Sequence, residues 1–137
     1  MRQASIMLAA AALLALGSAA SAGQVPDSGY FITQDKSGIV KLEPCGSNIC
    51  GVLVWGQDLK DGETDQANPN PARRSRPICG MAVLQFARSG DNASAYDPAT
   101  GKTERGFAVT GDASKLLLGG SEGETWPKTS QPSQRCR

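Results

Sequence analysis

The sequence contains no histidine, the side chain that enzymes use most often to move protons near neutral pH. Without an imidazole there is no Ser-His-Asp or Cys-His catalytic unit and no zinc site with a histidine ligand. A glycine-rich phosphate-binding motif is missing as well. The sequence therefore predicts a protein that is not an enzyme and that has no cofactor and no metal.

The chain also lacks an excess of charge of either sign. Lys and Arg number 14, and Asp and Glu number 13. A chain this close to neutral has no electrostatic basis for binding nucleic acid or for a polybasic contact with a membrane. Beyond the N-terminus, no apolar run approaches the roughly 20 residues that span a bilayer. We predict no nucleic-acid partner and no transmembrane segment in the mature chain.

The first 22 residues have the parts of a secretory signal peptide. Arg2 supplies a positive start, and residues 6–16 form an apolar stretch of about ten residues, too short to span a bilayer. The Ala-Ser-Ala at residues 20–22 is a typical cleavage site. An uncleaved anchor or a buried helix fits these features less well. We predict that residues 1–22 are a cleaved signal peptide and that residues 23–137 form a single domain, secreted to the periplasm.

Four cysteines remain in the exported domain, and an even number in a small exported domain favours disulfide bonds over free thiols. Four cysteines allow three pairings, and the sequence alone leaves all three open. Our preferred pairing joins Cys45 to Cys50 across a tight turn. It also joins Cys79 to Cys136, which fastens the C-terminal tail.

Short apolar segments separated by turn residues account for most of the domain. The segment 78–87 also suits a helix, but Pro77 before it and Gly80 within it favour a strand. Seven or eight short strands and no long amphipathic helix predict an all-β barrel or sandwich, and a closed barrel leaves no edge strands. The expected strands are Gly29–Gln34, Ile39–Glu43, Gly51–Trp55, Ile78–Ala87, Thr103–Thr110, Ser114–Leu118 and Gly123–Thr129.

The stretch 65–80 is the densest in proline and arginine, and we predict an ordered loop. Its three arginines are spaced to present planar guanidinium groups to a carboxylate or a phosphate. Alternatively, the loop satisfies itself, with Asp65 paired to an arginine and Asn68 capping its own turn. We favour the internal arrangement and keep as candidate ligand- or partner-binding residues Asp65, Asn68, Arg73, Arg74 and Arg76.

Two aromatic residues complete the candidate binding site. Trp55 is expected in the core or at a barrel rim, and Tyr96 in a turn. The carboxylates at 58, 61, 63 and 65 do not match an EF-hand loop. A solvated acidic turn is therefore favoured over a calcium or glycosidase site.

Four blocks along the chain resemble the domain of unknown function 2147 family. They are Cys-Gly-Ser-Asn-Ile-Cys-Gly-Val-Leu-Val-Trp at 45–55, Asp-x-x-Asn-Pro-Asn-Pro at 65–71, Arg-Arg-Ser-Arg-Pro-Ile-Cys-Gly at 73–80 and Tyr-Asp-Pro-x-x-Gly-Lys-Thr at 96–103. The resemblance implies an exported, uncharacterised bacterial protein. It also implies a small lipocalin-like (calycin-like) antiparallel β-barrel of about seven to eight short strands, with no established activity.

Both ends of the domain depart from the family pattern. Phe31 stands where the family has the tryptophan of Gly-x-Trp, and Trp126-Pro127-Lys128 stands where it has Trp-Thr-Arg. Lys128 over Phe31 is expected to make a weaker cation–π contact than arginine over tryptophan. Because Pro127 has no backbone donor, the last strand is expected to be short or at an edge.

These observations predict a non-enzymatic periplasmic module that binds a small amphipathic ligand or associates with the cell envelope. The alternative is a structural module that docks on an envelope protein through the 65–80 loop, and a carboxylate-based hydrolase is less favoured. At this length we expect side chains to fill the barrel interior. The sequence makes no prediction of oligomeric state.

Overall fold

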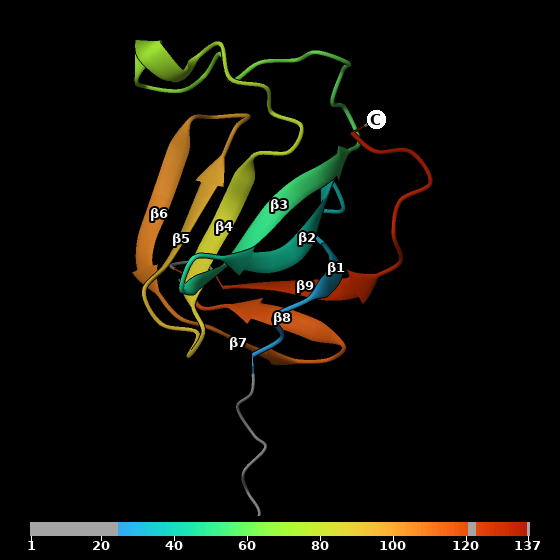
Figure 1. Ribbon diagram of the computed structural model, residues 1–137, viewed down its shortest axis with the longest axis vertical. Coiled ribbons are helices and arrows are strands. Elements are labelled where there is room, and N and C mark those ends of the chain that lie inside the picture. Colours follow the sequence, from blue (N-terminus) through green and yellow to red (C-terminus); the bar gives the residue numbers. More distant parts are fainter. Residues whose placement is uncertain (1–24, 121–122, 137) are drawn as a thin grey trace, which may run out of the picture.

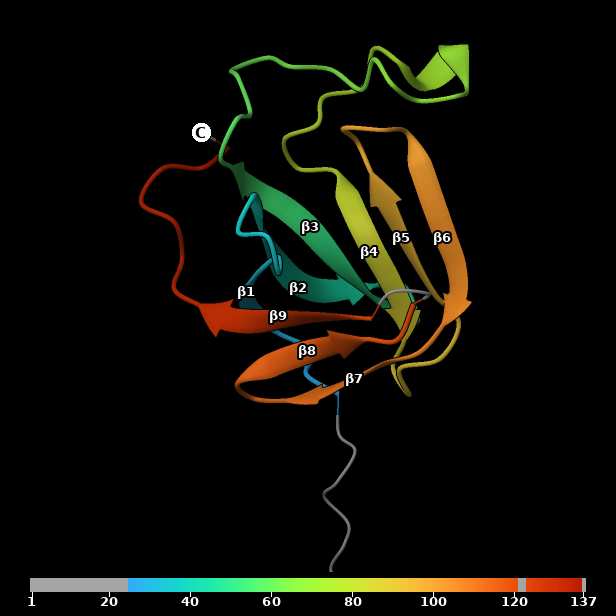
Figure 2. The ribbon, with the colours of Figure 1, turned by 180° about the vertical axis from the view of Figure 1, so that it is seen from behind.

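A computed structural model describes residues 25–120 and 123–136. The predicted signal peptide lies outside the described residues. The described chain forms one antiparallel nine-stranded sheet in the order β6-β5-β4-β3-β2-β1-β9-β8-β7. Figures 1 and 2 show β3–β6 forming one wall and β7–β9 crossing below it, so that the sheet curves into a half-barrel. The strands are β1 (Gly29–Ile32), β2 (Gly38–Cys45), β3 (Asn48–Gly56), β4 (Ala82–Ala87), β5 (Ala93–Asp97), β6 (Lys102–Phe107), β7 (Val109–Asp112), β8 (Lys115–Leu118) and β9 (Glu124–Thr129).

The hairpin of β2 and β3 contains the first disulfide. Cys45 lies opposite Asn48 in the register, so β2 continues through Pro44, where the sequence predicted it would stop. The bond between Cys45 and Cys50 bridges this hairpin, as predicted. Pro44 is tolerated inside the strand because the ladder with β1 ends at Leu42, so that no strand on that side of β2 needs a donor from Pro44.

The C-terminal tail is fastened beside β3. Cys136 is bonded to Cys79, which confirms the second half of the preferred pairing. The backbone N–H of Cys136 also donates to the carbonyl of Val54. The tail therefore covers part of β3 and is joined to the segment that leads into β4.

The sheet is more divided and less closed than the sequence predicted. The expected strand at 103–110 splits at Ala108 into β6 and β7, and β5 forms where no strand was expected. The count is therefore nine strands rather than seven to eight. Strands β6 and β7 are the two edges of the sheet, and within the described residues they follow one another without pairing. A half-barrel, whose edge strands β6 and β7 are consecutive in the chain and connected through Ala108, replaces the predicted closed barrel.

Pro127 lies in an interior strand rather than at an edge, because β9 is placed between β1 and β8. The ladder between β1 and β9 consists of Tyr30 opposite Thr129 and Phe31 opposite Lys128, and it ends before Pro127. On the β1 side the missing backbone donor therefore falls where no ladder partner remains, while on its other side Pro127 pairs with Lys115 of β8. Phe31 and Lys128 are direct register partners, the placement that the expected cation–π contact requires.

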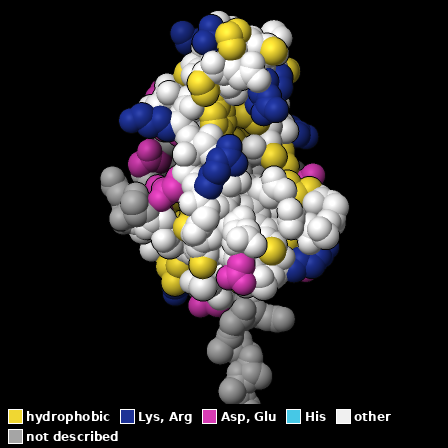
Figure 3. Space-filling view, turned by 90° about the vertical axis from the view of Figure 1, so that its left-hand side faces the viewer, with side chains coloured by type: hydrophobic (Ala, Val, Ile, Leu, Met, Phe, Trp, Pro, Cys, Tyr) yellow, Lys and Arg dark blue, Asp and Glu magenta, His cyan; other side chains and the backbone are white. Residues whose placement is uncertain are grey.

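Between β3 and β4 the chain leaves the sheet as the β3–β4 loop, residues 57–81, which lies above the strands in Figure 1. An isolated bridge pairs Thr64 with Pro77, and a single 3-10 turn, η2 (Pro71–Arg73), forms the tip. The Asn70 side chain caps η2 by accepting from the N–H of Ala72. Figure 3 shows Lys and Arg side chains gathered on the upper part of the face that it presents. None of the helical turns among the described residues has the length and apolar character needed to cross a bilayer.

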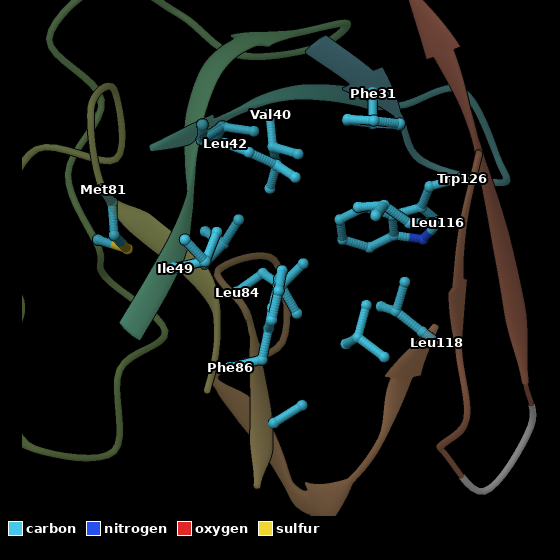
Figure 4. Close-up of a cluster of buried hydrophobic side chains, with 14 of the residues drawn as sticks. Phe31, Val40, Leu42, Ile49, Met81, Leu84, Phe86, Leu116, Leu118 and Trp126 are labelled. Atoms are coloured by element: carbon cyan, nitrogen blue, oxygen red, sulfur yellow. The ribbon is translucent and has the colours of Figure 1, made fainter. Parts of the chain in front are cut away.

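Apolar side chains from both walls meet in the interior of the half-barrel. Phe31, Leu84, Phe86 and Leu116 are each about 1% exposed or less. Trp126 points into this interior from β9, opposite Val40 and Leu84 in Figure 4. Burial of each large side chain stabilises the fold by about 1.5–3 kcal/mol. The remaining core residues include Val40, Leu42, Ile49, Leu53, Ile78, Met81, Val83, Ala93, Val109 and Leu118.

Candidate functional site

The side chain of Asp65 is the centre of the β3–β4 loop and is 0% exposed. One carboxylate oxygen accepts the hydroxyl of Tyr96 at 2.7 Å. The other accepts the Nδ2 donor of Asn68 at 2.8 Å and lies 3.6 Å from the Nη2 atom of Arg76. The backbone N–H of Asp65 donates to the carbonyl of Arg76 at 2.9 Å, which closes the base of the loop. A buried carboxylate needs such partners, because an unpaired one carries a large desolvation cost.

Asn68 extends this network along the loop. Its Oδ1 atom accepts the backbone N–H of Asn70 at 2.8 Å, and its carbonyl accepts the Nε donor of Arg74 at 2.8 Å. The polar groups of the loop thus satisfy one another, which is the internal arrangement that the sequence favoured. The Asp65 partner among the three arginines is Arg76.

The turn between β5 and β6 packs against the same loop. Gly101 has a φ of +78°, and a side chain there would collide with the carbonyl of Ala67. Together with the hydrogen bond from Tyr96, this close approach fixes the loop on the end of β5. The loop is therefore a structural part of the half-barrel.

The environment of Tyr96 strengthens its bond to the loop. Burial, the hydrogen bond to Asp65 and the charge of that carboxylate raise the pKa of Tyr96 from 10.0 to about 12. Since the pKa is shifted upward, the contribution of the neutral phenol to stability is fully present below pH 10. It is lost as the pH rises through 12.

Alkaline titration followed by tyrosinate absorbance tests this bond. We expect one phenol of the native protein to titrate near pH 12 and this step to be absent from a Tyr96→Phe variant. If the variant retains the late step, the raised pKa does not belong to Tyr96.

A cavity of about 710 Å³ opens inside the half-barrel, beside the β3–β4 loop. Its apolar lining includes Val40, Leu53, Ile78, Val83 and Trp126, each less than a tenth exposed. Its polar lining, exposed except at half-buried Thr33 and Tyr96, comes from the β1–β2 turn, the β3–β4 loop, the β5–β6 hairpin and the start of β9. The cavity is therefore apolar in its depth and polar at its mouth. This finding replaces the expectation that side chains fill the interior.

The structure brings five of the seven candidate residues together. Asp65, Asn68, Arg74, Arg76 and Tyr96 form the loop network, whereas Arg73 is exposed at the end of η2. Trp55 lies opposite Ile39 in the β2–β3 ladder and does not line the cavity. Of the seven, Tyr96 alone lines the cavity.

Sequence reasoning missed most of the cavity because its walls come from six strands and three connections. Two signals were nevertheless present. The acidic stretch contributes Asp58 and Glu63 to the cavity mouth, and Trp126 contributes its ring to the interior. Neither signal indicated that these residues face a common space.

Comparisons with known proteins identify the family and the fold. A family model described as "Uncharacterized protein conserved in bacteria (DUF2147)" matches residues 29–131. A solved structure described as "Protein HP1028 from the human pathogen Helicobacter pylori belongs to the lipocalin family" is similar with a TM-score of 0.64. The two chains are 22% identical, and the match covers 78% of this chain and 85% of that chain. No curated protein matches. At this identity the likeness shows the fold, which is lipocalin-like.

Proposed function

Since this chain belongs to the DUF2147 family of uncharacterised bacterial proteins, we propose that it binds a small amphipathic molecule in the cavity of its lipocalin-like half-barrel. The proposal is non-enzymatic and needs no cofactor or metal. It assigns the apolar part of the ligand to the interior and the polar part to the mouth.

The observation that carries the proposal is the cavity. Its volume of about 710 Å³ falls within the roughly 300–1,000 Å³ range of sites for small molecules. Buried Val40, Leu53 and Val83 line the depth, where an apolar group of the ligand would replace water. The exposed polar residues at the mouth leave a charged or hydroxylated head in contact with solvent.

The β3–β4 loop supports this role as a wall of the site. Leu59, Glu63 and Ile78 of the loop line the cavity, and Tyr96 lines it while donating to Asp65. Most of the arginine and asparagine groups proposed for docking are engaged inside the loop. No observation favours partner docking through this loop over ligand binding in the cavity.

We also propose that the domain acts in the periplasm after removal of residues 1–22. Two disulfides support an oxidising compartment, since such bonds persist in exported proteins and are rare in the cytosol. The Ala-Ser-Ala site at 20–22 supports cleavage before the domain begins. N-terminal sequencing of protein recovered from the periplasmic fraction tests both points, with Gly23 as the expected first residue.

Fluorescence of a single tryptophan tests ligand binding directly. In a Trp55→Phe variant, Trp126 remains as a reporter inside the cavity. We expect the uncharged probe N-phenylnaphthylamine to quench Trp126 saturably by energy transfer, with one probe bound per chain.

A cavity-filling substitution supplies the control. Ala95 lines the cavity from β5, whereas Ala82 in β4 is exposed and does not line it. In the Trp55→Phe background, Ala95→Phe is expected to abolish quenching, and Ala82→Phe is expected to leave it unchanged. Equal quenching in both variants, or none in the parent, would argue against a ligand site in the cavity.

A further inference from the structure

The charges around the cavity are strongly one-sided. Its lining contains one lysine, Lys102, and six carboxylate residues: Asp35, Asp58, Glu63, Asp97, Glu104 and Glu124. The whole chain, in contrast, carries a formal net charge of only +1. The acidic mouth therefore reflects a local segregation of charge and not an acidic protein.

We propose that the cavity selects cationic amphiphiles, molecules that join an apolar chain or ring to an ammonium group. The inference rests on the proposed function and adds the sign of the ligand's charge. It differs in sign from the less favoured alternative for the arginine-rich loop, the binding of a carboxylate or a phosphate.

The positions of the charges suit such a ligand. All six carboxylate residues are exposed, whereas Val40, Leu53, Ile78 and Val83 of the lining are buried. An ammonium group at the mouth would keep part of its hydration while its apolar portion enters the interior. Like charges around a concave opening add their fields and attract a cation before it binds.

The hydrogen bonds that Asp35 and Asp97 accept come from neutral donors, which leave the negative charge of both carboxylates available. Asp35 accepts from the hydroxyl of Thr33 at 2.8 Å and from the hydroxyl of Ser37 at 2.7 Å, both neutral donors. The side-chain and backbone donors of Ser37, with Thr33, hold the pKa of Asp35 below its usual value. Asp97 likewise accepts from the backbone N–H of Ala99 at 2.9 Å.

Glu124 and Trp126 provide the most specific part of the site. The indole Nε1 of Trp126 donates to Oε1 of Glu124 at 2.8 Å, which holds a carboxylate beside an aromatic ring. Both residues line the cavity. Ammonium groups bind favourably over aromatic rings, and tryptophan gives the strongest such interaction.

A divalent metal is a less suitable occupant than an organic cation. Within the described residues, no three carboxylate or cysteine side chains converge closely enough to hold a metal ion. Calcium needs six to eight oxygen ligands around one point. Dispersed carboxylates above an apolar interior match a larger ion of low charge density.

Three matched ligands test the inference: decyltrimethylammonium, decanol and decanoate, each below its micelle concentration. They share an apolar chain and differ in charge, and each would displace N-phenylnaphthylamine from the Trp55→Phe protein. We expect the cation to bind about tenfold more tightly than decanol, decanoate to bind more weakly than decanol, and the preference for the cation to fall with added salt.

Charge-neutral variants locate the effect. In an Asp58→Asn/Glu124→Gln variant, the loss of two negative charges is expected to lower the affinity for the cation to nearly that for decanol. Glutamine can still accept the hydrogen bond from Trp126, so this contact is kept. An Asp27→Asn/Asp61→Asn variant removes two exposed carboxylates outside the cavity lining and should retain the preference. Equal binding of cation and alcohol by the parent would overturn cation selection and leave the proposed function standing. Failure of all three ligands and of the probe would overturn the proposed function itself.

Discussion

Replacing both Cys79 and Cys136 by alanine is expected to lower the free energy of unfolding by about 4 kcal/mol. The bond spans a sequence separation of 57, and a cross-link over such a loop restricts the unfolded chain strongly in the chain-entropy model. In the folded state it holds the tail beside β3, where the N–H of Cys136 meets the carbonyl of Val54. Chemical denaturation under non-reducing conditions measures the loss.

The other disulfide supplies a matched control. Cys45 and Cys50 are separated by only 5 in sequence, and the same model gives about 2 kcal/mol for their bond. The Cys45→Ala/Cys50→Ala variant should therefore lie between the native protein and the Cys79→Ala/Cys136→Ala variant in stability. If the short bond proves the more stabilising of the two, restriction of the unfolded chain does not account for the order.

The second large effect is expected from Asp65→Ala, which should cost about 3 kcal/mol of unfolding free energy. The substitution leaves the Tyr96 hydroxyl, the Asn68 amide and the Arg76 guanidinium without their shared acceptor. Removal of one partner from a buried charged network costs about 3–5 kcal/mol. The lower end applies because the Arg76 side chain is 47% exposed and is solvated when it is released.

Two further variants separate the network from the charge alone. Asp61→Ala removes an exposed carboxylate of the same loop and should change stability by less than about 0.5 kcal/mol. A double-mutant cycle of Asp65→Ala with Tyr96→Phe should give a coupling of about 1–2 kcal/mol, because the two side chains share one buried hydrogen bond. A small loss in Asp65→Ala, matching that of Asp61→Ala, would show that Asp65 does not hold the loop.

Local chemistry explains why several features were predictable from the sequence. Two cysteines five residues apart around a Gly-Ser-Asn turn allow a hairpin bridge, and the Cys45–Cys50 bond has that form. A loop rich in proline, asparagine and arginine carries enough donors and acceptors to satisfy itself, and Asp65 and Asn68 lie in such a network. The all-β fold followed from short apolar segments between turn residues.

The features that sequence reasoning missed depend on tertiary contacts. Ala-Ser-Ala-Tyr-Asp at 93–97 has small and polar residues between turn signals, and it becomes β5 because β4 and β6 pair with it on either side. Ala108 separates β6 from β7, and its carbonyl accepts the N–H of Gly119, a residue beyond β8. The cavity could not be predicted because Asp35, Trp126 and the loop residues meet only after the half-barrel has formed.

Methyl NMR of the mature protein titrated with decanol tests the central claim most directly, since this uncharged ligand probes the cavity whatever its charge preference. The account predicts that methyl resonances of Val40, Leu53 and Val83 shift and saturate together, because these side chains line the cavity. The methyls of Ile49, in the packed core, and of exposed Leu117 should hardly move. Unmoved cavity methyls at saturating decanol, or equal shifts at Leu117, would contradict binding inside the half-barrel.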